Sequence, residues 1–423
     1  LDRTRTRLWT PAMKPLVLAA LLLGSLLLAR PAAGQGNPVL NVMEQAIGTA
    51  PQVMASKADI ERANAAAARL RAGPYEYEVS ASGGQRMIDD PLASEDRYTE
   101  WAAGVSRTVR LPGKQRIDRD LARLEIELAN AAFDQTLYEE RLTFADLWRD
   151  WVLADLLTET SYAQAAEADR LAELEQLRVD KGAGRQIRAD QLAAEASLVR
   201  FQAEQDKLTA AAARIALMAR YPEIVLPPPP PMLDLSRAEI SLMLESSADS
   251  SPPYRAAQLV GERARARARR ARSDQMPDPT LGMEFTNDFG GGETSLVARV
   301  TIPIGGVARR EEAREMARSA TVAELNAVSV YRQWLQDLEV TRQSARLSMA
   351  LHEESLRAID TSSLVLEKIQ KGYDLGEVTI TDLISSRRHY LSAQRVAAEQ
   401  QAAMETAFLK LIILGGEEKI YKD

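Results

Sequence analysis

The sequence predicts a mainly α-helical protein with a small β part, in which a unit of two strands and a long helical hairpin occurs twice. Three observations predict this fold class. Two long stretches, residues 114–181 and 307–371, contain neither glycine nor proline. Short segments of alternating polar and apolar residues precede both stretches, and the glycines that flank the stretches recur at a fixed offset. We therefore expect an elongated, duplicated chain rather than a compact globular domain.

The two uninterrupted stretches are rich in residues that favour helices. At a rise of about 1.5 Å per residue each would form a rod of about 100 Å, whereas helices of globular proteins average about 12 residues. Aromatic residues make up only 5 % of the chain, as in coiled coils. A second helix is expected after each stretch, over residues 186–219 and 379–414. The last helix carries a seven-residue seam, typical of packing along a neighbour, at Leu383, Tyr390, Ala397, Met404 and Leu411.

Glycines around the long stretches indicate an internal duplication. Gly113 and Gly184 lie 71 residues apart (184 − 113). Gly305 and Gly376 lie 71 residues apart as well (376 − 305), so the two halves are offset by 192 residues. The first glycine of each pair, together with Gly306, marks the corner between strand and helix, and the second marks the turn at the hairpin tip. In each half an aspartate follows the tip glycine by six residues: Asp190 and Asp382.

Alternating segments before each long helix predict four half-buried strands, because successive side chains of a strand point to opposite faces. Tyr75, Tyr77 and Val79, for example, alternate with acidic and serine residues. The four segments are residues 75–82, 101–105, 280–286 and 295–302. Turns are expected over residues 83–97 in one hairpin and over residues 288–293, which include three glycines, in the other.

Four strands cannot close a barrel, and this bears on how the chain assembles. Unpaired edge N–H and C=O groups in lipid would each cost several kcal/mol, and bacterial membrane barrels have eight or more strands. No segment after the N-terminal apolar run reaches the ~20 apolar residues of a spanning helix. Strands pooled from several protomers would therefore cross a membrane. A small soluble sheet that caps a coiled coil is the alternative.

The N-terminal segment has the order of a secretory signal peptide. Lys14 precedes an apolar run over residues 16–28, and small residues follow at 32–34. On this interpretation Met13 is the natural start and residues 1–12 are an upstream extension; a retained membrane anchor is the alternative. The expected domains are residues 1–34 as signal peptide, 35–221 as first repeat, 222–235 as proline-rich linker and 236–423 as second repeat, which opens with a helix over 236–248.

Composition excludes several classes of function. The net charge of −7 does not favour nucleic acid, and we interpret the arginine-rich run 263–272 as a solvated helix face. Because the chain has no cysteine, we exclude disulfides, thiolate metal sites and lipidation of a cysteine at the mature N-terminus. The two histidines, His352 and His389, lie far apart and outside any ligand-spaced cluster. With no nucleophile–base set or phosphate loop, we expect no enzyme activity, catalytic residue, metal or cofactor.

Four short motifs are spread along the chain. Residues 372–383 read Gly-Tyr-Asp-Leu-Gly-Glu-Val-Thr-Ile-Thr-Asp-Leu, residues 277–281 Pro-Asp-Pro-Thr-Leu, and residues 111–114 Leu-Pro-Gly-Lys; Gly415-Gly416 comes last. Residues 372–383 resemble the second hairpin tip of TolC-like outer-membrane efflux proteins. Residues 277–281 resemble the entry into the third strand of that family, residues 111–114 resemble its strand-to-helix corner, and Gly415-Gly416 resembles the end of its final helix. The resemblance extends over nearly all of the chain after the signal peptide. The corners are most similar to the cobalt–zinc–cadmium resistance branch.

The resemblance implies a homotrimer with a twelve-stranded barrel, four strands per protomer, in outer-membrane lipid, and a helical barrel in the periplasm. Its partners would be a periplasmic adaptor (membrane fusion protein) and an inner-membrane pump of the RND type. The chain would then be the passive, gated exit duct of a tripartite pump for metals or drugs. A type I secretion channel, a periplasmic adaptor and a coiled-coil scaffold are the alternative functions, and the cargo is not readable from the chain.

The resemblance also implies a pore gate at the hairpin tips, formed by Asp190, Tyr373, Asp374 and Asp382. Asp382 matches a ring of aspartates that narrows the tunnel, and Tyr373 matches a tyrosine that bonds the aspartate at position 190. Two positions depart from the family's pattern. Val378 stands where a locking arginine is found, and Ser385 stands where a second aspartate ring lies.

Structural roles explain the same residues. Thr379 and Asp382 have the spacing of a capping box at the start of the returning helix. Tyr373 would then cover the turn, and Gly184 and Gly376 would serve as sharp helix ends. A capped carboxylate can still face the tunnel axis, so the two interpretations of Asp382 are compatible.

Overall fold

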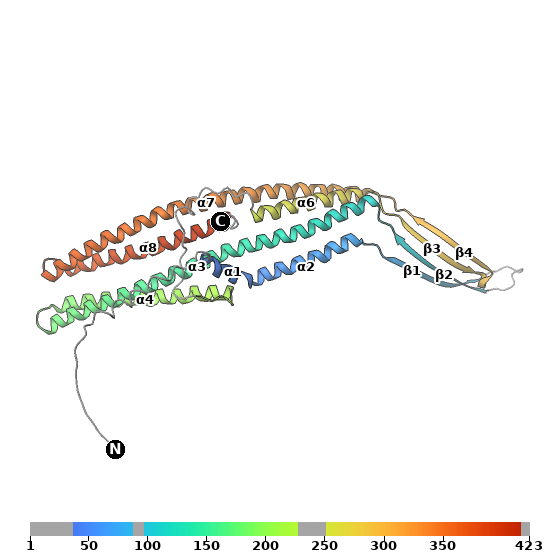
Figure 1. The fold of residues 1–423 in the computed structure, drawn as a ribbon. Coiled ribbons are helices and arrows are strands. Elements are labelled where there is room, and N and C mark those ends of the chain that lie inside the picture. The colour runs from blue at the N-terminus through green and yellow to red at the C-terminus, as the bar shows by residue number, and fades with distance from the viewer. Residues whose placement is uncertain (1–36, 88–96, 227–250, 416–423) are drawn as a thin grey trace, which may run out of the picture.

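The computed structural model describes residues 37–87, 97–226 and 251–415, and shows a long, thin molecule with strands at one end and two hairpin tips at the other (Figure 1). The predicted signal peptide, the expected helix over residues 236–248 and most of the proline-rich linker lie outside the described residues. A mainly helical fold with a small sheet is confirmed.

Two helices of 69 residues each, α3 (Pro112–Asp180) and α7 (Val307–Leu375), run from the strands to the tips. Helices α4 (Gln186–Arg220) and α8 (Ile380–Gly415) return from the tips and complete the two hairpins. Helix α3 begins at Pro112, two residues before the expected start, because proline fits the first turn of a helix. Helix α7 continues past residue 371 and through Gly372, so the expected end there was too early.

The helices form one layer that is four helices wide along most of its length. In the half nearer the strands, α2 (Pro51–Ala72) packs beside α3, and α6 (Pro252–Ser273) lies between α3 and α7. In the half nearer the tips, α4 takes the place of α2 and α8 takes the place of α6. The short helix α1 (Pro38–Gly48) packs against α3 near the middle. Each long helix is accompanied along its length by two shorter helices in series. Because these neighbours cover the long helices, neither hairpin needs a globular core.

The largest of the three apolar clusters in the described chain lies where these shorter helices meet, halfway along the rod. Phe144 and Trp148 of α3 stack with ring centroids 5.3 Å apart, and both are buried. Tyr221, just after α4, is fully buried, and its hydroxyl donates to the Glu140 carboxylate at 3.1 Å. Ile412 near the end of α8 joins the same cluster. The two hairpins are therefore joined most firmly at the middle.

Four antiparallel strands form one sheet in the order β1 (Tyr77–Met87), β2 (Arg97–Thr108), β3 (Thr280–Asp288) and β4 (Glu293–Thr301). The expectation of a turn from residue 83 was wrong. Strand β1 continues to Met87, because Gly83 and Gly84 pair with Trp101 and Glu100 of β2. Tyr75, expected in the first strand, lies before β1, and its hydroxyl donates to Asp278 at 2.8 Å.

The pairing register sorts the side chains onto two unlike faces. One face is largely apolar and exposed; Arg107 shares it, with its guanidinium over the Tyr77 ring. The large apolar side chains of this face, with exposed fractions between 39 % and 83 %, are Tyr77, Val79, Trp101, Val105, Leu281, Met283, Phe285, Leu296 and Val300. The other face is polar and mostly small, and includes Ser80, Gly84, Ala102, Gly104, Ser106, Gly282, Glu284 and Ser295. Strands β1 and β4 are the edges of the sheet, and the described chain offers no further strand to either.

None of the described helices combines the length and apolar character that a membrane span requires.

Candidate functional site

Both hairpin tips turn on glycines, but the two turns are built differently. Gly376 ends α7 in the left-handed conformation (φ 82°), and its N–H bonds back to the carbonyls of residues 372 and 373. At the first tip the left-handed residue is Gly182 (φ 72°), not the predicted tip glycine Gly184. Gly184 is required for another reason, because a Cβ there would lie 2.8 Å from the backbone nitrogen of Val179. Gly184 and Gly376, which correspond by their spacing in the sequence, therefore have different structural roles.

Asp382 and Thr379 form the capping box at the start of α8. The Thr379 hydroxyl accepts the Asp382 N–H at 3.2 Å, and the Asp382 carboxylate accepts the Thr379 N–H at 3.2 Å and its hydroxyl at 2.6 Å. The side chain of Asp382 remains exposed, so its charge still faces solvent. The structural role of Asp382 is thus present, while its place in a pore ring stays a prediction.

The expected hydrogen bond between Tyr373 and Asp190 is absent from the described chain. Tyr373 is buried in a small apolar cluster with Leu192 and Leu383, and its hydroxyl has no well-aligned hydrogen-bond partner. Burial and the nearby carboxylate of Glu175 raise the pKa of Tyr373. Asp190 is exposed and accepts instead from the Gln186 side chain at 2.8 Å. The tyrosine turns inward while the aspartate stays on the surface of α4, which separates the two groups.

A different contact joins the two tips. Arg178, in the last turn of α3, bonds the carboxylate of Asp374 in α7 at 3.2 Å and that of Glu175 at 3.1 Å. Its guanidinium also lies 6.0 Å from the ring centroid of Tyr373. The hydrogen bond to Asp374 raises the pKa of Arg178. No motif in the sequence marks Arg178, and only the fold brings it beside a residue 196 positions away.

Polar contacts continue from this bridge along the seam between α8 and the first hairpin. The pairs are Arg387 with Glu167, Arg388 with Glu195, Gln394 with Gln164, and Arg395 with Asp206. A cavity of about 410 Å³ lies along this seam, lined by apolar side chains such as Leu171 and Ile384 and by Arg387. Burial lowers the pKa of Arg387, and the Glu167 carboxylate partly offsets this effect. The seam is therefore polar and loosely filled, unlike the apolar middle of the rod.

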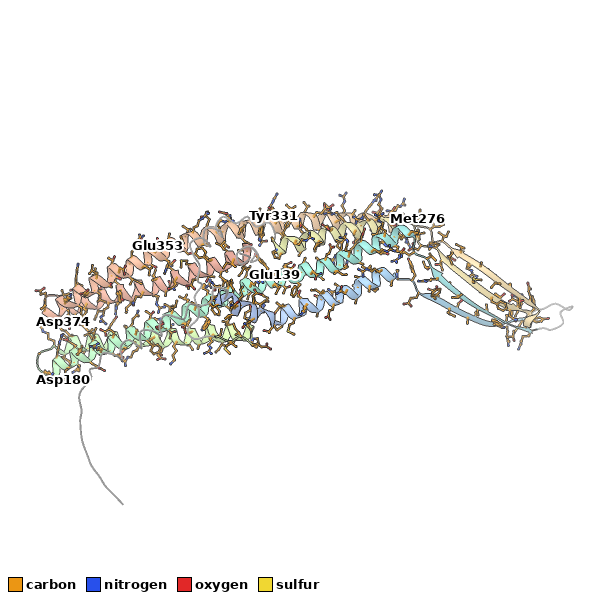
Figure 2. All side chains as sticks on the ribbon, viewed as in Figure 1. Glu139, Asp180, Met276, Tyr331, Glu353 and Asp374 are labelled. Atoms are coloured by element: carbon orange, nitrogen blue, oxygen red, sulfur yellow. The ribbon has the colours of Figure 1, made fainter. Side chains whose placement is uncertain are left out.

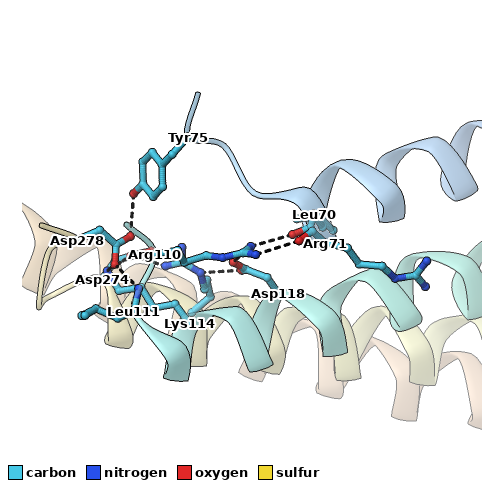
Figure 3. A network of polar contacts seen from close by, with 10 residues as sticks. Leu70, Arg71, Tyr75, Arg110, Leu111, Lys114, Asp118, Asp274 and Asp278 are labelled. Carbon is cyan, nitrogen blue, oxygen red and sulfur yellow. Dashed lines mark hydrogen bonds and ion pairs between the residues drawn. The ribbon is translucent and has the colours of Figure 1, made fainter. Parts of the chain in front are cut away.

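At the opposite end of α3, a buried ion network holds the corner between strands and helices (Figure 3). Lys114 is 1 % exposed, and its ammonium lies 3.0 Å from the carboxylates of both Asp274 and Asp278. Asp278 also accepts the Leu111 N–H at 3.1 Å and the Tyr75 hydroxyl at 2.8 Å. Burial alone would raise the pKa of Asp278, but these three partners outweigh it and hold the pKa below its ordinary value.

Arg110 extends the network to the neighbouring helices. It donates to the carbonyls of residues 70 and 71 in the last turn of α2, and to the carboxylate of Asp118, each at 2.9 Å. Arg270 of α6 donates to the other oxygen of Asp118 at 2.7 Å. Backbone carbonyls of α2 and side chains of α3 and α6 therefore meet at the base of the sheet. Sequence reasoning included residues 111–114 and 277–281 as motifs, but it did not identify the ion pairs between them.

The three predicted corner glycines differ in how tightly they are packed. Gly113 lies in the first turn of α3 and Gly306 directly precedes α7, and a Cβ at either position would meet open space. At Gly305 a Cβ would lie 2.3 Å from the carbonyl oxygen of Gln275. Only Gly305 is therefore demanded by close approach of another backbone segment.

No group of three acidic or histidine side chains within residues 37–87, 97–226 and 251–415 could hold a metal ion. Figure 2 shows side chains along the whole length of the helical rod, with Asp180 and Asp374 at the two hairpin tips.

No protein-family model and no characterised protein sequence matches this chain. Solved structures do match it. The outer membrane protein VceC of Vibrio cholerae aligns with a TM-score of 0.72 and 17 % identity, over 89 % of this chain and 96 % of that one. The CmeC outer membrane channel of Campylobacter jejuni gives 0.74 and 14 %, over 90 % and 86 %. The open state of the MtrE outer membrane channel of Neisseria gonorrhoeae gives 0.68 and 15 %, over 89 % of each chain. The chain has the fold of these channels.

Proposed function

We propose that this chain is the outer-membrane exit channel of a tripartite efflux pump. Three protomers would pool their sheets into a twelve-stranded barrel and their helix layers into a periplasmic tube. A periplasmic adaptor and an inner-membrane pump, of the RND type, would supply cargo and energy, and this chain would be a passive, gated conduit for metals or drugs. The fold that it shares with outer membrane channels supports the proposal.

The exposed apolar face of the sheet is the observation that carries this proposal. The strands contain 9 to 12 residues, and a strand needs about 9–11 residues to cross a bilayer. An apolar face of this size in water would favour aggregation, whereas lipid would cover it without loss. Pairing of β4 with β1 of the next protomer would satisfy both edges, as a membrane requires of every backbone polar group.

Two neighbouring alanines in the middle of β2 allow a matched test. Ala103 lies on the apolar face opposite Phe285, and Ala102 lies on the polar face opposite Thr286. An arginine on the lipid side of a barrel near the bilayer midplane costs about 2–4 kcal/mol. Ala103→Arg should therefore strongly reduce heat-modifiable trimers in the outer-membrane fraction, and Ala102→Arg should not. Equal yields of the two variants, or soluble monomers from the unmodified chain, would refute the barrel.

The tip contacts support a gate in which the second hairpin swings about the apolar middle. The Arg178–Asp374 bridge is 46 % and 49 % exposed at its two ends, so each copy contributes about 0–1 kcal/mol. Three copies would hold the closed state by at most about 3 kcal/mol, or about two orders of magnitude in the closed-to-open ratio. Such a weak latch can be released by a partner protein, and salt would weaken it further.

Single-channel recording in planar bilayers tests this latch. Arg178→Ala and Asp374→Ala should each raise the open probability, and the double variant should add little, because both single changes remove the same bridge. Lys181→Ala removes a nearby exposed charge at the same tip and serves as the control. Wild-type gating in both single variants would rule out the bridge as the latch.

For Asp382 the charge and the cap can be separated. We propose that three copies form a ring at the tunnel entrance that attracts cations. Asp382→Asn keeps an oxygen that can accept the Thr379 N–H but removes the charge, so the helix should remain capped while cation preference falls. An unchanged cation-to-anion permeability ratio in Asp382→Asn would dismiss the ring.

A further inference from the structure

The turn between β3 and β4 holds the only described residue other than glycine with a positive φ. Phe289 has φ 49°, and Gly290 and Gly291 follow with φ 61° and 103°. They form the short helix η1 (Phe289–Gly291). A bulky side chain is strained in this region, and such strain persists only where the surroundings enforce it, often at functional positions. Three glycines adjoin this position, yet a phenylalanine occupies it.

Contacts to the ends of two other strands hold the Phe289 ring. The ring meets that of Tyr98 edge to face, with centroids 5.6 Å apart. The guanidinium of Arg86 lies over the Phe289 ring, 4.7 Å from its centroid. The Arg86 Nε also pairs with the Glu100 carboxylate at 2.8 Å. Residues from β1, β2 and the β3–β4 turn therefore converge on one aromatic ring at the end of the sheet farthest from the helices.

The register shows on which face this happens. Arg86 pairs directly with Tyr98, and Glu100 lies opposite Gly84, so all three occupy the polar face. Phe289 is thus folded over the polar face and away from the apolar one. The strands below carry mostly small side chains on that face, such as Ala102, and no aromatic side chain other than Tyr98. The large side chains below the rim are charged, among them Glu284 and Arg299, which pair with each other at 3.4 Å, so aromatic bulk on this face is confined to the outer rim.

We propose that Phe289, Tyr98 and Arg86 form a collar around the outer mouth of the channel and set the size of molecule that passes it. The collar rests on the proposed trimer, in which the polar faces line the lumen and three copies of Phe289 surround one axis. An eight-stranded barrel is filled by its own side chains, whereas barrels of 16–18 strands leave a wide aqueous channel. A twelve-stranded barrel lies between these limits, so large side chains at its rim decide the free width.

The collar carries no net charge of its own and acts through its size. Arg86 carries the only cationic group in it, and Glu100 neutralises that charge at hydrogen-bonding distance. The Phe289 and Tyr98 rings are uncharged, and one face of the Arg86 guanidinium packs on the Phe289 ring. The collar itself therefore adds no net charge to the mouth, while Asp288 and Glu293 occupy the same face at this rim.

Because the chain contains no cysteine, a single introduced thiol can report access from outside. Ala102→Cys lies on the polar face, four residues below Tyr98. Intact cells carrying this variant would be treated with maleimides that bear polyethylene glycol chains of graded size. With Phe289 present, small reagents should label the thiol and large ones should not. Adding Phe289→Ala should raise labelling by the large reagents severalfold and leave labelling by the smallest unchanged.

Control variants separate failure of the collar from failure of the channel. Ala103→Cys faces lipid in the proposed barrel and should stay unlabelled at every size; labelling of Ala103→Cys equal to that of Ala102→Cys would overturn the barrel itself. Phe289→Trp retains a large ring and should keep the size limit, and Arg86→Met frees the ring and should relax it. A second outcome is that Ala102→Cys is labelled and Ala103→Cys is not, but the size limit at Ala102→Cys is the same with Phe289 and with Phe289→Ala. That outcome refutes the collar and leaves the barrel intact. Heat-modifiable trimers confirm that each variant is assembled.

Discussion

Replacing Lys114 by methionine removes the charge at the centre of the corner network and keeps a side chain of similar length. Lys114 and Asp278 are each 1 % exposed in their side chains, so water cannot take the place of the lost ammonium. Removing one partner of a buried ion pair costs about 3–5 kcal/mol, because the other charge is left uncompensated.

The surroundings of the two carboxylates place Lys114→Met at the lower end of that range. Asp278 keeps its hydrogen bonds from Leu111 and Tyr75, and Asp274 keeps its pair with Arg270. We therefore expect a loss of about 3 kcal/mol in the free energy of unfolding. A Lys114→Met, Asp278→Asn double variant should recover part of the loss, since it removes the unpaired charge.

Urea unfolding in detergent, followed by loss of the helical circular dichroism signal, measures this difference. Lys410→Met is the control, because its partner Asp146 lies at 2.7 Å but the pair is 28 % and 45 % exposed, and it should lose no more than about 1 kcal/mol. If Lys114→Met loses no more than Lys410→Met, the buried network does not stabilise the corner. A double variant that is less stable than Lys114→Met would contradict the unpaired-charge explanation.

Two further changes test the same corner. Because the pKa of Asp278 is lowered below its ordinary value of 3.8, its contribution is complete above that value and is lost as the pH falls through the folded pKa; Asp278→Asn should therefore flatten the loss of stability below about pH 4, as followed by acid unfolding. Gly305→Ala forces a Cβ against the Gln275 carbonyl and should cost about 1–3 kcal/mol. Gly306→Ala meets open space and should be nearly neutral, so equal melting temperatures of the two variants would show that the backbone relaxes freely.

The helices were predictable because the information that specifies them is local. Long runs of helix formers between breakers place α3 and α4 within two residues of the expected bounds. The strands were found but their ends were not, since the pairing that carries β1 through two glycines to Met87 comes from β2. Alternation predicts that a strand exists, whereas its length depends on the neighbour that it pairs with.

The tip site shows the limit of sequence reasoning more clearly. Asp374 was named from a motif, but its partner Arg178 lies in an unremarkable helical turn of the other half. Tyr373 was expected to bond Asp190, and its ring is instead buried beside Leu383. A motif preserves which residue types occur at a turn, while the choice of partner depends on how two hairpins settle against each other, which no local pattern encodes.

Duplication by 192 residues makes the two strand-to-helix corners equivalent in sequence, yet they are held by different means. Position 114 carries the buried lysine, and the equivalent position 306 carries a glycine. The partners of Lys114, Asp274 and Asp278, belong to the second half, so a single network fixes both the start of α3 and the entry to β3. The corner between β4 and α7 relies on the close approach of Gly305 to a backbone carbonyl and on a hydrogen bond from Arg309 to the carbonyl of residue 274. That corner lies at the edge of the sheet, where in the proposed trimer the next protomer would contact it. The Lys114 network therefore holds the corner in the interior of each protomer. The β4–α7 corner at the sheet edge would gain its remaining contacts only when the neighbouring protomer binds.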